Sequence, residues 1–335
     1  MSLSMKRISL KEKFSGPSEH APAAMVGPGL HMVERKSLVA QVMYQLERAL
    51  VLESRKFLER VLFVVLHGFS AGFIAVVYLR PLHGVVPGAF LMAHLAFALI
   101  NVIFVVFMYS TEKAQIAREV RSGASYLAYW IARNLLLLFD NVGYSMVSSA
   151  ALSLFCRLNL PFRSHWWLTF LLTYFSASMG QFFNFAFASA QTAIVVACVL
   201  VLLMGGVLSG ANPPLSELEE NSMLFKKYWG LPGLSFSRWS VEAAAMDEWE
   251  SRADLPKAEF DALLRLFAYD QRDYWTCYGW LFIAGTLLRL ASLSMLVANV
   301  DKSKSPLRAL KRNASRLIPS ATLARAWSRS ASFVR

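Results

Sequence analysis

Long apolar runs separated by short polar segments dominate the chain between residues 57 and 300. A helix needs about 20 largely apolar residues to cross a bilayer, and six segments reach this length. Because the backbone polar groups of a segment in lipid must be satisfied internally, we expect these runs to be helices. The predicted spans lie near residues 61–79, 85–108, 126–155, 166–187, 190–208 and 277–298.

The fourth and fifth spans come from one stretch, residues 166–208, which contains no Asp, Glu, Lys or Arg. At about 1.5 Å per residue the stretch is roughly twice the length of a span. It must therefore fold back, and we predict the turn near Phe187–Gln191. The predicted fold is an all-α membrane protein, a six-span helical bundle formed by residues 57–300.

Two segments outside the spans carry a pattern of their own. Apolar residues recur at helical spacing within 34–56 and predict an amphipathic connecting helix on the membrane surface. These residues are Leu38, Val42, Leu46, Leu50 and Val51. After the fifth span, Pro213 and Pro214 end the helix, and the aromatic residues that follow predict an external re-entrant or loop segment. A simple membrane anchor and an ordinary external loop explain these two patterns equally well.

Composition supports the membrane assignment, since 56% of residues are hydrophobic and only 17% are charged. Soluble domains carry about 25% charged residues. Residues 1–33 contain basic residues but no apolar core of a signal peptide, so we predict a disordered cytosolic leader. Residues 301–335 form a basic tail that could bind anionic lipid or serve only as a topology signal.

Lysine and arginine predict the orientation. Residues 1–60 and the tail after residue 298 are strongly basic, whereas residues 209–275 hold seven basic and twelve acidic residues. Six spans place both termini on one side, so both termini are predicted to be cytosolic and residues 209–275 external. A plasma membrane or an organelle membrane is compatible with this topology.

Charges followed by aromatic residues join the second and third spans, in EKAQIAREVRSGASYLAYW, residues 112–130. With this topology the segment is a cytosolic loop. The residues that form its motif are an Arg-Glu pair, a small residue followed by glycine, a tyrosine and an aromatic pair. These are Arg118-Glu119, Ser122-Gly123, Tyr126 and Tyr129-Trp130. A second marked run, LSFSRWSVEA at residues 234–243, follows Ser209-Gly210 and the proline turn.

The order and spacing of these motifs resemble the transmembrane domain of ABC transporters of the G subfamily, which has the ABC-2 membrane fold. The resemblance covers about residues 34–300. It implies that residues 112–126 couple the spans to a nucleotide-binding domain, beside the connecting helix. The coupling residues it implies are Glu112, Arg118, Glu119, Gly123 and Tyr126.

The sequence contains no GxxxxGK[ST] phosphate-binding loop, the motif that binds the phosphates of ATP. We therefore predict no catalytic residue, no cofactor and no enzymatic activity on this chain. ATP and Mg²⁺ would act through a nucleotide-binding domain on a separate subunit or on a longer gene product. The other expected partners are membrane lipid and a second transmembrane half, as a homodimer or heterodimer. Nucleic acid is not expected.

The resemblance also implies a substrate path along spans two and five, which meet at the dimer axis in that family. The predicted path residues are Phe97, Ile100, Asn101, Phe104, Val199, Leu202 and Leu203. Their mostly apolar character suits a hydrophobic or lipid-like substrate. Ordinary helix packing accounts for the same residues.

Polar residues within spans are costly and therefore informative. Asp140 is the best functional candidate among them, unless it lies near the inner interface. For His67, His94 and Arg289 we predict structural roles. Cys156, Cys198 and Cys277 lack the spacing of a metal site, although Cys156 and Cys277 fall near external span ends and could form a disulfide.

The predicted function is the permease part of an ATP-driven ABC exporter of hydrophobic or lipid-like substrates. The alternative is a transport-inactive scaffold or regulatory partner derived from such a transporter. A membrane-embedded enzyme is disfavoured, because polar residues are scattered along the spans.

Overall fold

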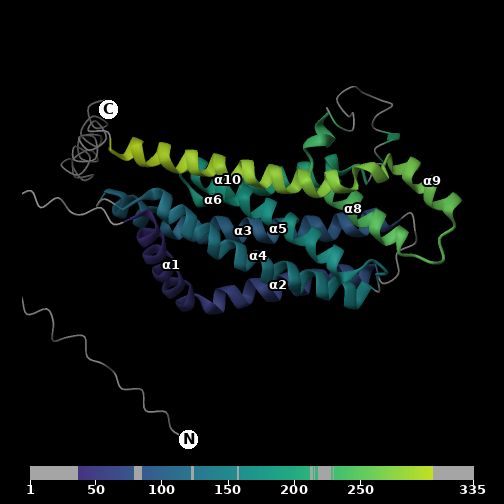
Figure 1. The fold of residues 1–335 in the computed structure, drawn as a ribbon, viewed down its shortest axis with the longest axis horizontal. Coiled ribbons are helices and arrows are strands. Elements are labelled where there is room, and N and C mark those ends of the chain that lie inside the picture. Colours follow the sequence, from purple (N-terminus) through teal and green to yellow (C-terminus); the bar gives the residue numbers. More distant parts are fainter. Residues whose placement is uncertain are drawn as a thin grey trace, which may run out of the picture. The chain divides into compact units, whose positions relative to one another are not determined.

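The computed structural model describes residues 37–78, 85–121, 124–156, 158–211, 214, 216–217, 228 and 230–304. The predicted leader and nearly all of the basic tail lie outside these residues. The long helices (Figure 1) are α1 (Leu38–Arg55), α2 (Phe57–Val77), α3 (Val86–Arg121), α4 (Tyr126–Cys156), α5 (Phe162–Ala186), α6 (Ala190–Gly205), α8 (Phe236–Glu250), α9 (Lys257–Phe267) and α10 (Tyr274–Lys304).

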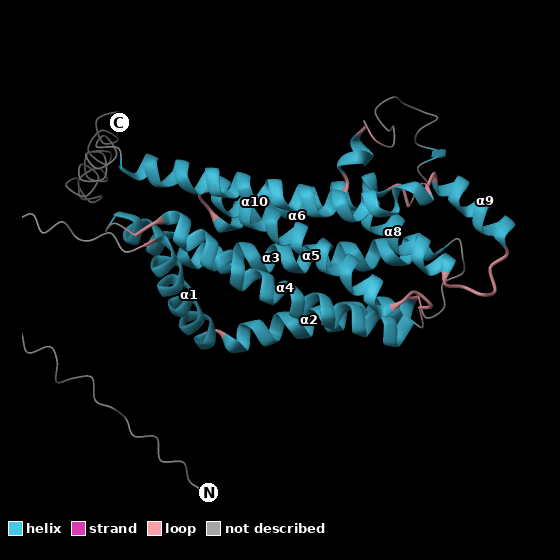
Figure 2. Cartoon of the chain, viewed as in Figure 1, coloured by secondary structure: helices cyan, strands magenta, loops and turns pink. Residues whose placement is uncertain are grey.

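Helices make up almost all of the described chain (Figure 2), and its only strand-like pairing is a bridge between Ala211 and Pro214. This confirms the predicted all-helical fold. Five helical segments are long and apolar enough to cross a membrane, and they comprise α2, α3, α4, α6 with the following 3-10 turn, and α10. The protein is therefore an integral membrane protein.

The helix α5, which corresponds to the fourth predicted span, is not among these five. It has 25 residues, about 37 Å at 1.5 Å per residue. Its low hydrophobicity comes from polar side chains that the bundle buries. These include Thr169, Thr173, Ser176, Ser178, Gln181 and Asn184.

Three neighbours surround α5, because it packs mainly against α10, α3 and α4. A helix enclosed in this way needs no apolar surface for lipid. Gly180 allows the close approach of α5 to α3, since a Cβ there would lie 3.0 Å from the carbonyl oxygen of Val102. Small residues serve the same purpose at other membrane helix contacts. The chain between α5 and α6 leaves the helical conformation at residues 187–189.

Continuous helix runs through α3 for 36 residues, roughly 54 Å. This exceeds the hydrocarbon thickness of about 30 Å, so one end of α3 must project from the bilayer. The charged segment after residue 108 is helical as far as Arg121, and the prediction of a loop there is wrong. Its charges are held by partners on other helices, which a sequence pattern alone does not reveal.

The segment between α6 and α10 forms the short helix α8, which is almost entirely buried. It packs against α3, α10, α5 and α6. Ser235 caps its start by accepting a hydrogen bond from the backbone N–H of Arg238 at 3.3 Å. With 15 residues, about 22 Å, α8 is too short to cross a bilayer.

The helix α1 leads into α2 through the single residue Lys56 and is inclined to the long helices (Figure 1). A polar face of α1 contacts the bundle, and apolar side chains on another face are exposed. Gln45, Ala49 and Glu53 are buried against the bundle, whereas the apolar side chains of Val39 and Leu50 are exposed. The polar stripe of α1 therefore attaches it to the other helices.

Candidate functional site

A stripe of residues at four-residue spacing lines the face of α1 that packs on α4. It consists of Gln41, Gln45, Ala49 and Glu53. Residues four apart lie on the same side of a helix. At the first of these positions, the side-chain Oε1 of Gln41 accepts a hydrogen bond from the backbone N–H of Ser125 at 3.2 Å. This bond ties the start of α1 to the residue that precedes α4.

Arg133, two turns into α4, lies at the centre of this end of the bundle and is 1% exposed. Its Nε donates to Glu112 Oε2 at 2.8 Å and its Nη1 donates to Glu53 Oε1 at 2.6 Å. The hydroxyl of Tyr129 donates to the same oxygen of Glu112 at 3.0 Å. One guanidinium thus joins α1, α3 and α4.

A second arginine, Arg60 at the start of α2, continues the network. Its Nε donates to Glu53 Oε2 at 3.0 Å, and its Nη1 lies 3.0 Å from Asp140 Oδ1 on α4. The carboxylate of Glu53 is therefore shared between two guanidiniums. We call these five residues (Glu53, Arg60, Glu112, Arg133 and Asp140) the inner network.

More exposed contacts surround the inner network. Arg48 on α1 pairs with Glu119 near the end of α3. The ammonium group of Lys56 donates to the hydroxyl of Thr111 at 3.0 Å. Pairs that are open to water contribute at most about 1 kcal/mol, so these contacts add more to geometry than to stability.

The charges of the inner network depend on one another. Burial raises the pKa of Glu53, but the guanidiniums of Arg133 and Arg60 outweigh burial and hold this pKa below its ordinary value. The Glu53 carboxyl is therefore ionised. Removing one partner from a buried ion pair typically costs about 3–5 kcal/mol, because the remaining charge is left without compensation.

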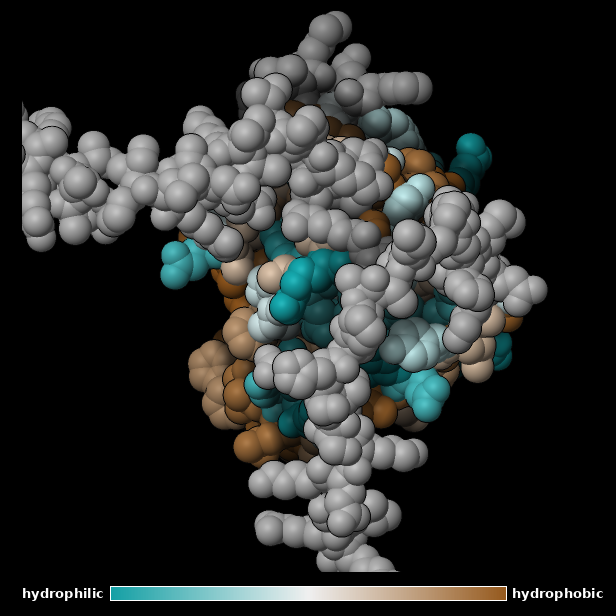
Figure 3. Space-filling model, turned by 90° about the vertical axis from the view of Figure 1, so that its left-hand side faces the viewer, coloured by the Kyte–Doolittle hydropathy of each residue, from teal (hydrophilic) through white to brown (hydrophobic). Residues whose placement is uncertain are grey.

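Four helices meet in this network, so it can transmit displacement between them. A movement of α1 must either carry α3 and α4 with it or exchange one set of ion pairs for another. Packed elements joined in this way usually have discrete arrangements. Figure 3 shows this end of the molecule, where hydrophilic residues gather near the centre and hydrophobic residues lie around them.

The predicted coupling residues divide between buried and exposed positions. Glu112 belongs to the inner network, and Glu119 pairs with Arg48. Arg118 and Tyr126 are exposed, and Gly123 lies outside the described residues. The two acidic residues thus contact α4 and α1 respectively, while the two exposed residues remain accessible to a partner.

The predicted substrate-path residues do not share one surface. Phe97, Asn101 and Phe104 are buried within the chain. The side-chain amide of Asn101 donates to the carbonyl oxygen of Thr173 at 2.6 Å, which makes it a packing contact between α3 and α5. Ile100 is partly exposed. The α6 residues Val199, Leu202 and Leu203 are each nearly half exposed.

Polar residues predicted to be structural have the expected partners. The Nδ1 of His67 lies 2.8 Å from the carbonyl oxygen of Phe63, and the Nδ1 of His94 lies 2.9 Å from the Ser240 hydroxyl. Arg289 donates to the Ser178 hydroxyl and to Asn134 Oδ1, both at 2.9 Å. These predicted structural contacts are confirmed.

The three cysteines are free thiols. All three cysteines lie in the described residues, and none forms a disulfide. The thiol of Cys156 donates instead to the carbonyl oxygen of Tyr78 at 2.7 Å. The disulfide considered between Cys156 and Cys277 is therefore wrong. Over the described ranges, no three His, Cys, Asp or Glu residues are grouped closely enough to hold a metal ion.

Acidic residues of α8 form a second set of polar contacts at the opposite end of the bundle. The carboxylate of Glu248 accepts from the backbone N–H groups of Asn159 at 2.8 Å and Leu160 at 3.0 Å, and from Arg252 Nε at 2.8 Å. Arg238 and Glu242 form a fully buried pair at 2.9 Å. We call Arg238, Glu242, Glu248 and Arg252 the outer set.

Asp247 lies beside the outer set and accepts from the hydroxyls of Ser164 and Tyr274. Burial raises the pKa of this carboxyl above its ordinary value, although the two hydroxyl donors partly oppose the shift. The pKa of Asp247 therefore moves in the opposite direction to that of Glu53, because no arginine compensates its burial in the same way.

Sequence reasoning missed Glu53, Arg60 and Arg133 as site residues. A signal for them was present. Arg133 is a charge inside a predicted span, and such a charge requires a partner. Arg133 and Asp140 are also seven residues apart within one predicted span, so they lie two turns apart on one helical face.

Comparison with family models gives one match. The model of the ABC-2 type transporter family matches residues 30–302. This range contains every described helical residue except the last two of α10. Comparison with curated proteins gives no match.

Proposed function

The chain belongs to the ABC-2 type transporter family and is thus a membrane component of an ABC transporter; we propose that it is the permease of an ATP-driven exporter of hydrophobic or lipid-like substrates. Members of this family typically dimerise and pair with ATP-binding subunits. The observation that carries the proposal is the inner network, which joins α1 to the membrane helices through Arg133 and Arg60.

Coupling would proceed from the cytosolic end of the bundle. An ATP-binding partner docks against α1 and the end of α3, where Arg118 and Tyr126 are exposed. ATP binding moves the partner, and the Arg48–Glu119 pair and the inner network carry this movement to α2 and α4. The chain itself supplies the ion pairs that transmit the movement, while ATP and Mg²⁺ bind to the partner.

The path for substrate would lie between two permease halves. Exposed apolar residues of α6, including Val199 and Leu203, would line it together with Met92, Ile103 and Phe107 of α3. These helices pack side by side in the chain. An apolar lining favours a substrate that leaves water readily.

The topology that supports this function has six spans, with α5 as the enclosed fourth span. Both termini are cytosolic in this arrangement, and α8 is a re-entrant helix at the external side. The plasma membrane is the proposed location. A buried polar helix such as α5 is compatible with a membrane because its neighbours cover it.

The first test is purification of the chain from its native membranes in mild detergent, followed by mass spectrometry and an ATPase assay. The proposal predicts ATP-binding protein in stoichiometric amount, either as a partner or on the same polypeptide, with measurable hydrolysis. An eluate that contains no ATP-binding protein and shows no ATP hydrolysis would favour the alternative, a transport-inactive scaffold or regulatory partner.

The coupling role is tested in the reconstituted complex by Glu119→Ala, with Glu59→Ala, an exposed acid on α2, as the control. Glu119→Ala removes the partner of Arg48 and should uncouple ATP hydrolysis from export. Equal export by wild type and Glu119→Ala would contradict the assigned role of the α3 end.

A further inference from the structure

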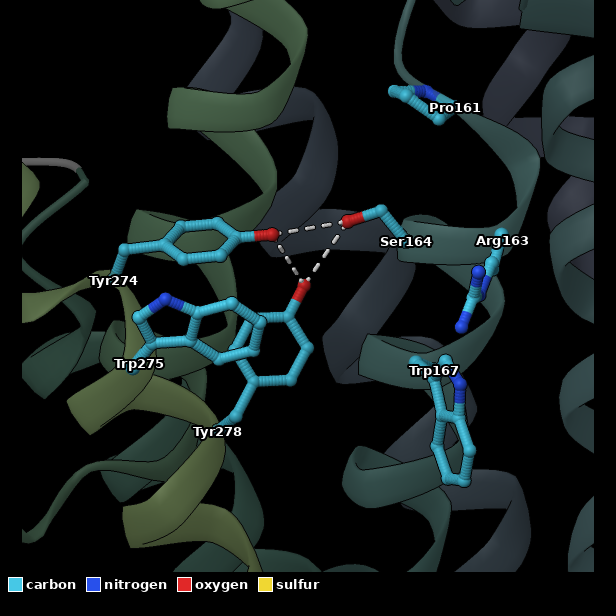
Figure 4. Close-up of a pocket in the computed structure, with 7 residues that line it drawn as sticks. All are labelled: Pro161, Arg163, Ser164, Trp167, Tyr274, Trp275 and Tyr278. Atoms are coloured by element: carbon cyan, nitrogen blue, oxygen red, sulfur yellow. Dashed lines mark hydrogen bonds between the residues drawn. The ribbon is translucent and has the colours of Figure 1, made fainter.

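A cavity of about 460 Å³ opens between the first turns of α5 and α10, at the end of the bundle opposite α1. Seven residues line it (Figure 4), and they are Pro161, Arg163, Ser164, Trp167, Tyr274, Trp275 and Tyr278. This volume lies within the range of small-molecule sites, about 300–1,000 Å³. Neither the inner network nor the proposed substrate path uses these residues.

Aromatic rings form most of the cavity wall. On α10 the ring of Trp275 lies 5.2 Å from Tyr274 at 82° and 5.8 Å from Tyr278 at 44°. Because of these angles the rings face the cavity in different directions and do not form one parallel stack. Trp167 on α5 stands across the cavity from them (Figure 4). A group of this kind attracts cations through the faces of its rings.

Hydroxyl groups at the cavity edge are already engaged with one another. The Ser164 hydroxyl lies 3.2 Å from the Tyr274 hydroxyl and 3.1 Å from the Tyr278 hydroxyl (Figure 4). Ser164 and Tyr274 also both donate to Asp247. The single protons of Ser164 and Tyr274 therefore point toward the carboxylate, and the Tyr278 hydroxyl donates to the oxygen of Ser164 or Tyr274. This edge presents oxygen lone pairs, which also favour a positively charged ligand.

A positive group stands on the other side of the same cavity. Arg163 precedes Trp167 by one helical turn and is exposed, and it forms no ion pair within the described part of the chain. Guanidinium groups bind phosphate through paired N–H donors. The cavity thus offers a cation site and a phosphate site within one ligand length.

We propose that this cavity binds the phosphocholine headgroup of a membrane lipid. The trimethylammonium group would lie among Trp167, Trp275 and Tyr278, and the phosphate would bind Arg163. Trp275 and Trp167 are 77% and 44% exposed, and such rings are typical of the level of lipid headgroups. An anionic headgroup without the ammonium would engage Arg163 alone.

The source of the headgroup is a lipid because α10, which lines the cavity, also carries exposed apolar side chains beyond it. Phe282 lies two turns below Trp275 on α10 and is 54% exposed, so acyl chains can follow this helix. In the proposed orientation the cavity lies at the outer leaflet. The proposal does not require transport and is independent of the ATP-binding partner.

The test is native mass spectrometry of the full chain after equilibration with equal amounts of phosphatidylcholine, phosphatidylethanolamine and phosphatidylglycerol of matched acyl chains. Trp275→Ala, Arg163→Gln and the control Phe73→Ala are compared with wild type. Phe73 is an exposed aromatic residue near the end of α2 that does not line this cavity. All the changed side chains are exposed, so folding should persist and is checked by size exclusion.

Wild type and Phe73→Ala should retain phosphatidylcholine in preference to the other two lipids. Trp275→Ala should lose this preference by about five- to tenfold, the loss of a cation–π contact. Arg163→Gln should weaken retention of all three lipids, because all three carry the phosphate. Competition by free phosphocholine at the lipid's own concentration would support the same chemistry with a soluble source.

Two results would overturn the proposal. One is equal retention of the three lipids, or a preference for phosphatidylglycerol, by wild type. The other is a phosphatidylcholine preference in Trp275→Ala that equals that of Phe73→Ala. Because none of these measurements uses ATP or export, their failure leaves the transport proposal to be judged by its own tests.

Discussion

The two ends of the bundle both bury charged side chains, but they arrange them differently. Each ion pair of the inner network joins residues of different helices, as Arg133 does with Glu53 and Glu112. In the outer set the pairs Arg238–Glu242 and Glu248–Arg252 are four residues apart in the chain. The outer acids also accept hydrogen bonds from backbone N–H groups.

This difference predicts that the two ends respond differently when the helices move. An ion pair between helices changes when one helix moves, whereas a pair within a short segment moves with that segment. Backbone acceptor contacts further fix the outer acids to their surroundings. We therefore interpret the inner network as the part of the molecule that rearranges and the outer set as the part that stays rigid.

The largest effect is expected for Arg133→Leu. It leaves the buried carboxylates of Glu112 and Glu53 without their shared partner, and unfolding should become easier by about 3–5 kcal/mol. The measurement is thermal unfolding in detergent followed by fluorescence-detected size exclusion. Arg118→Leu, an exposed arginine on α3, is the control and should leave stability unchanged. Equal stability of the two variants would contradict the assigned centre of the inner network.

A double variant separates stability from coupling. Arg60→Leu alone leaves the buried carboxylate of Asp140 without its ion-pair partner and should lower the free energy of unfolding by about 3 kcal/mol. Arg60→Leu combined with Asp140→Leu should recover much of this lost stability. If the pair serves movement, the double variant should fold and support ATP hydrolysis but lose export. Restored export in the double variant would show that the charges serve only stability.

The outer set should show the reverse behaviour. Glu248→Gln removes the charge that binds Arg252 and weakens the contacts to two backbone N–H groups, at a cost of about 1–3 kcal/mol. Export per folded molecule should stay at the level of wild type. Glu250→Gln, an exposed position on the same helix, is the control. A specific loss of export in Glu248→Gln would place coupling at this end as well.

The smallest effect is the opposite pH dependence of the two ends. The pKa of Glu53 is lowered in the folded chain, so its stabilising contribution is complete above its ordinary value of 4.5 and is lost as the pH falls through the lowered value. The pKa of Asp247 is raised, so its contribution is present below 3.8 and is lost as the pH rises through the raised value.

Unfolding of wild type, Glu53→Gln and Asp247→Asn across this pH range measures both contributions. The stability difference between wild type and Glu53→Gln should shrink on acidification, whereas wild type should lose stability relative to Asp247→Asn as the pH rises. Parallel curves for the two variants would remove the electrostatic distinction between the ends.

Sequence patterns predicted the helices well where length and hydrophobicity decide the structure. They failed where tertiary contacts decide it. The charges after residue 108 indicated a loop, yet α3 continues because α1 and α4 supply partners for Glu112 and Glu119. The apolar stripe of α1 predicted a helix on the membrane surface, but it gave no indication that Gln45 and Glu53 attach this helix to the bundle. The sequence shows that burying a charged residue is energetically costly, but it does not show which residue pairs with that charge.

The central claim is that the inner network rearranges while the outer set stays rigid. Spin labels at Val39 on α1 and Phe69 on α2 report the inner end, and labels at Leu154 on α4 and Glu250 on α8 report the outer end. All four positions are exposed. Distances are measured by pulsed electron paramagnetic resonance in the complex with the proposed ATP-binding subunit, with and without a non-hydrolysable ATP analogue. We predict that the nucleotide shifts the inner distance to a second population and leaves the outer distance unchanged. An unchanged inner distance, or an outer shift of the same size, would contradict the account.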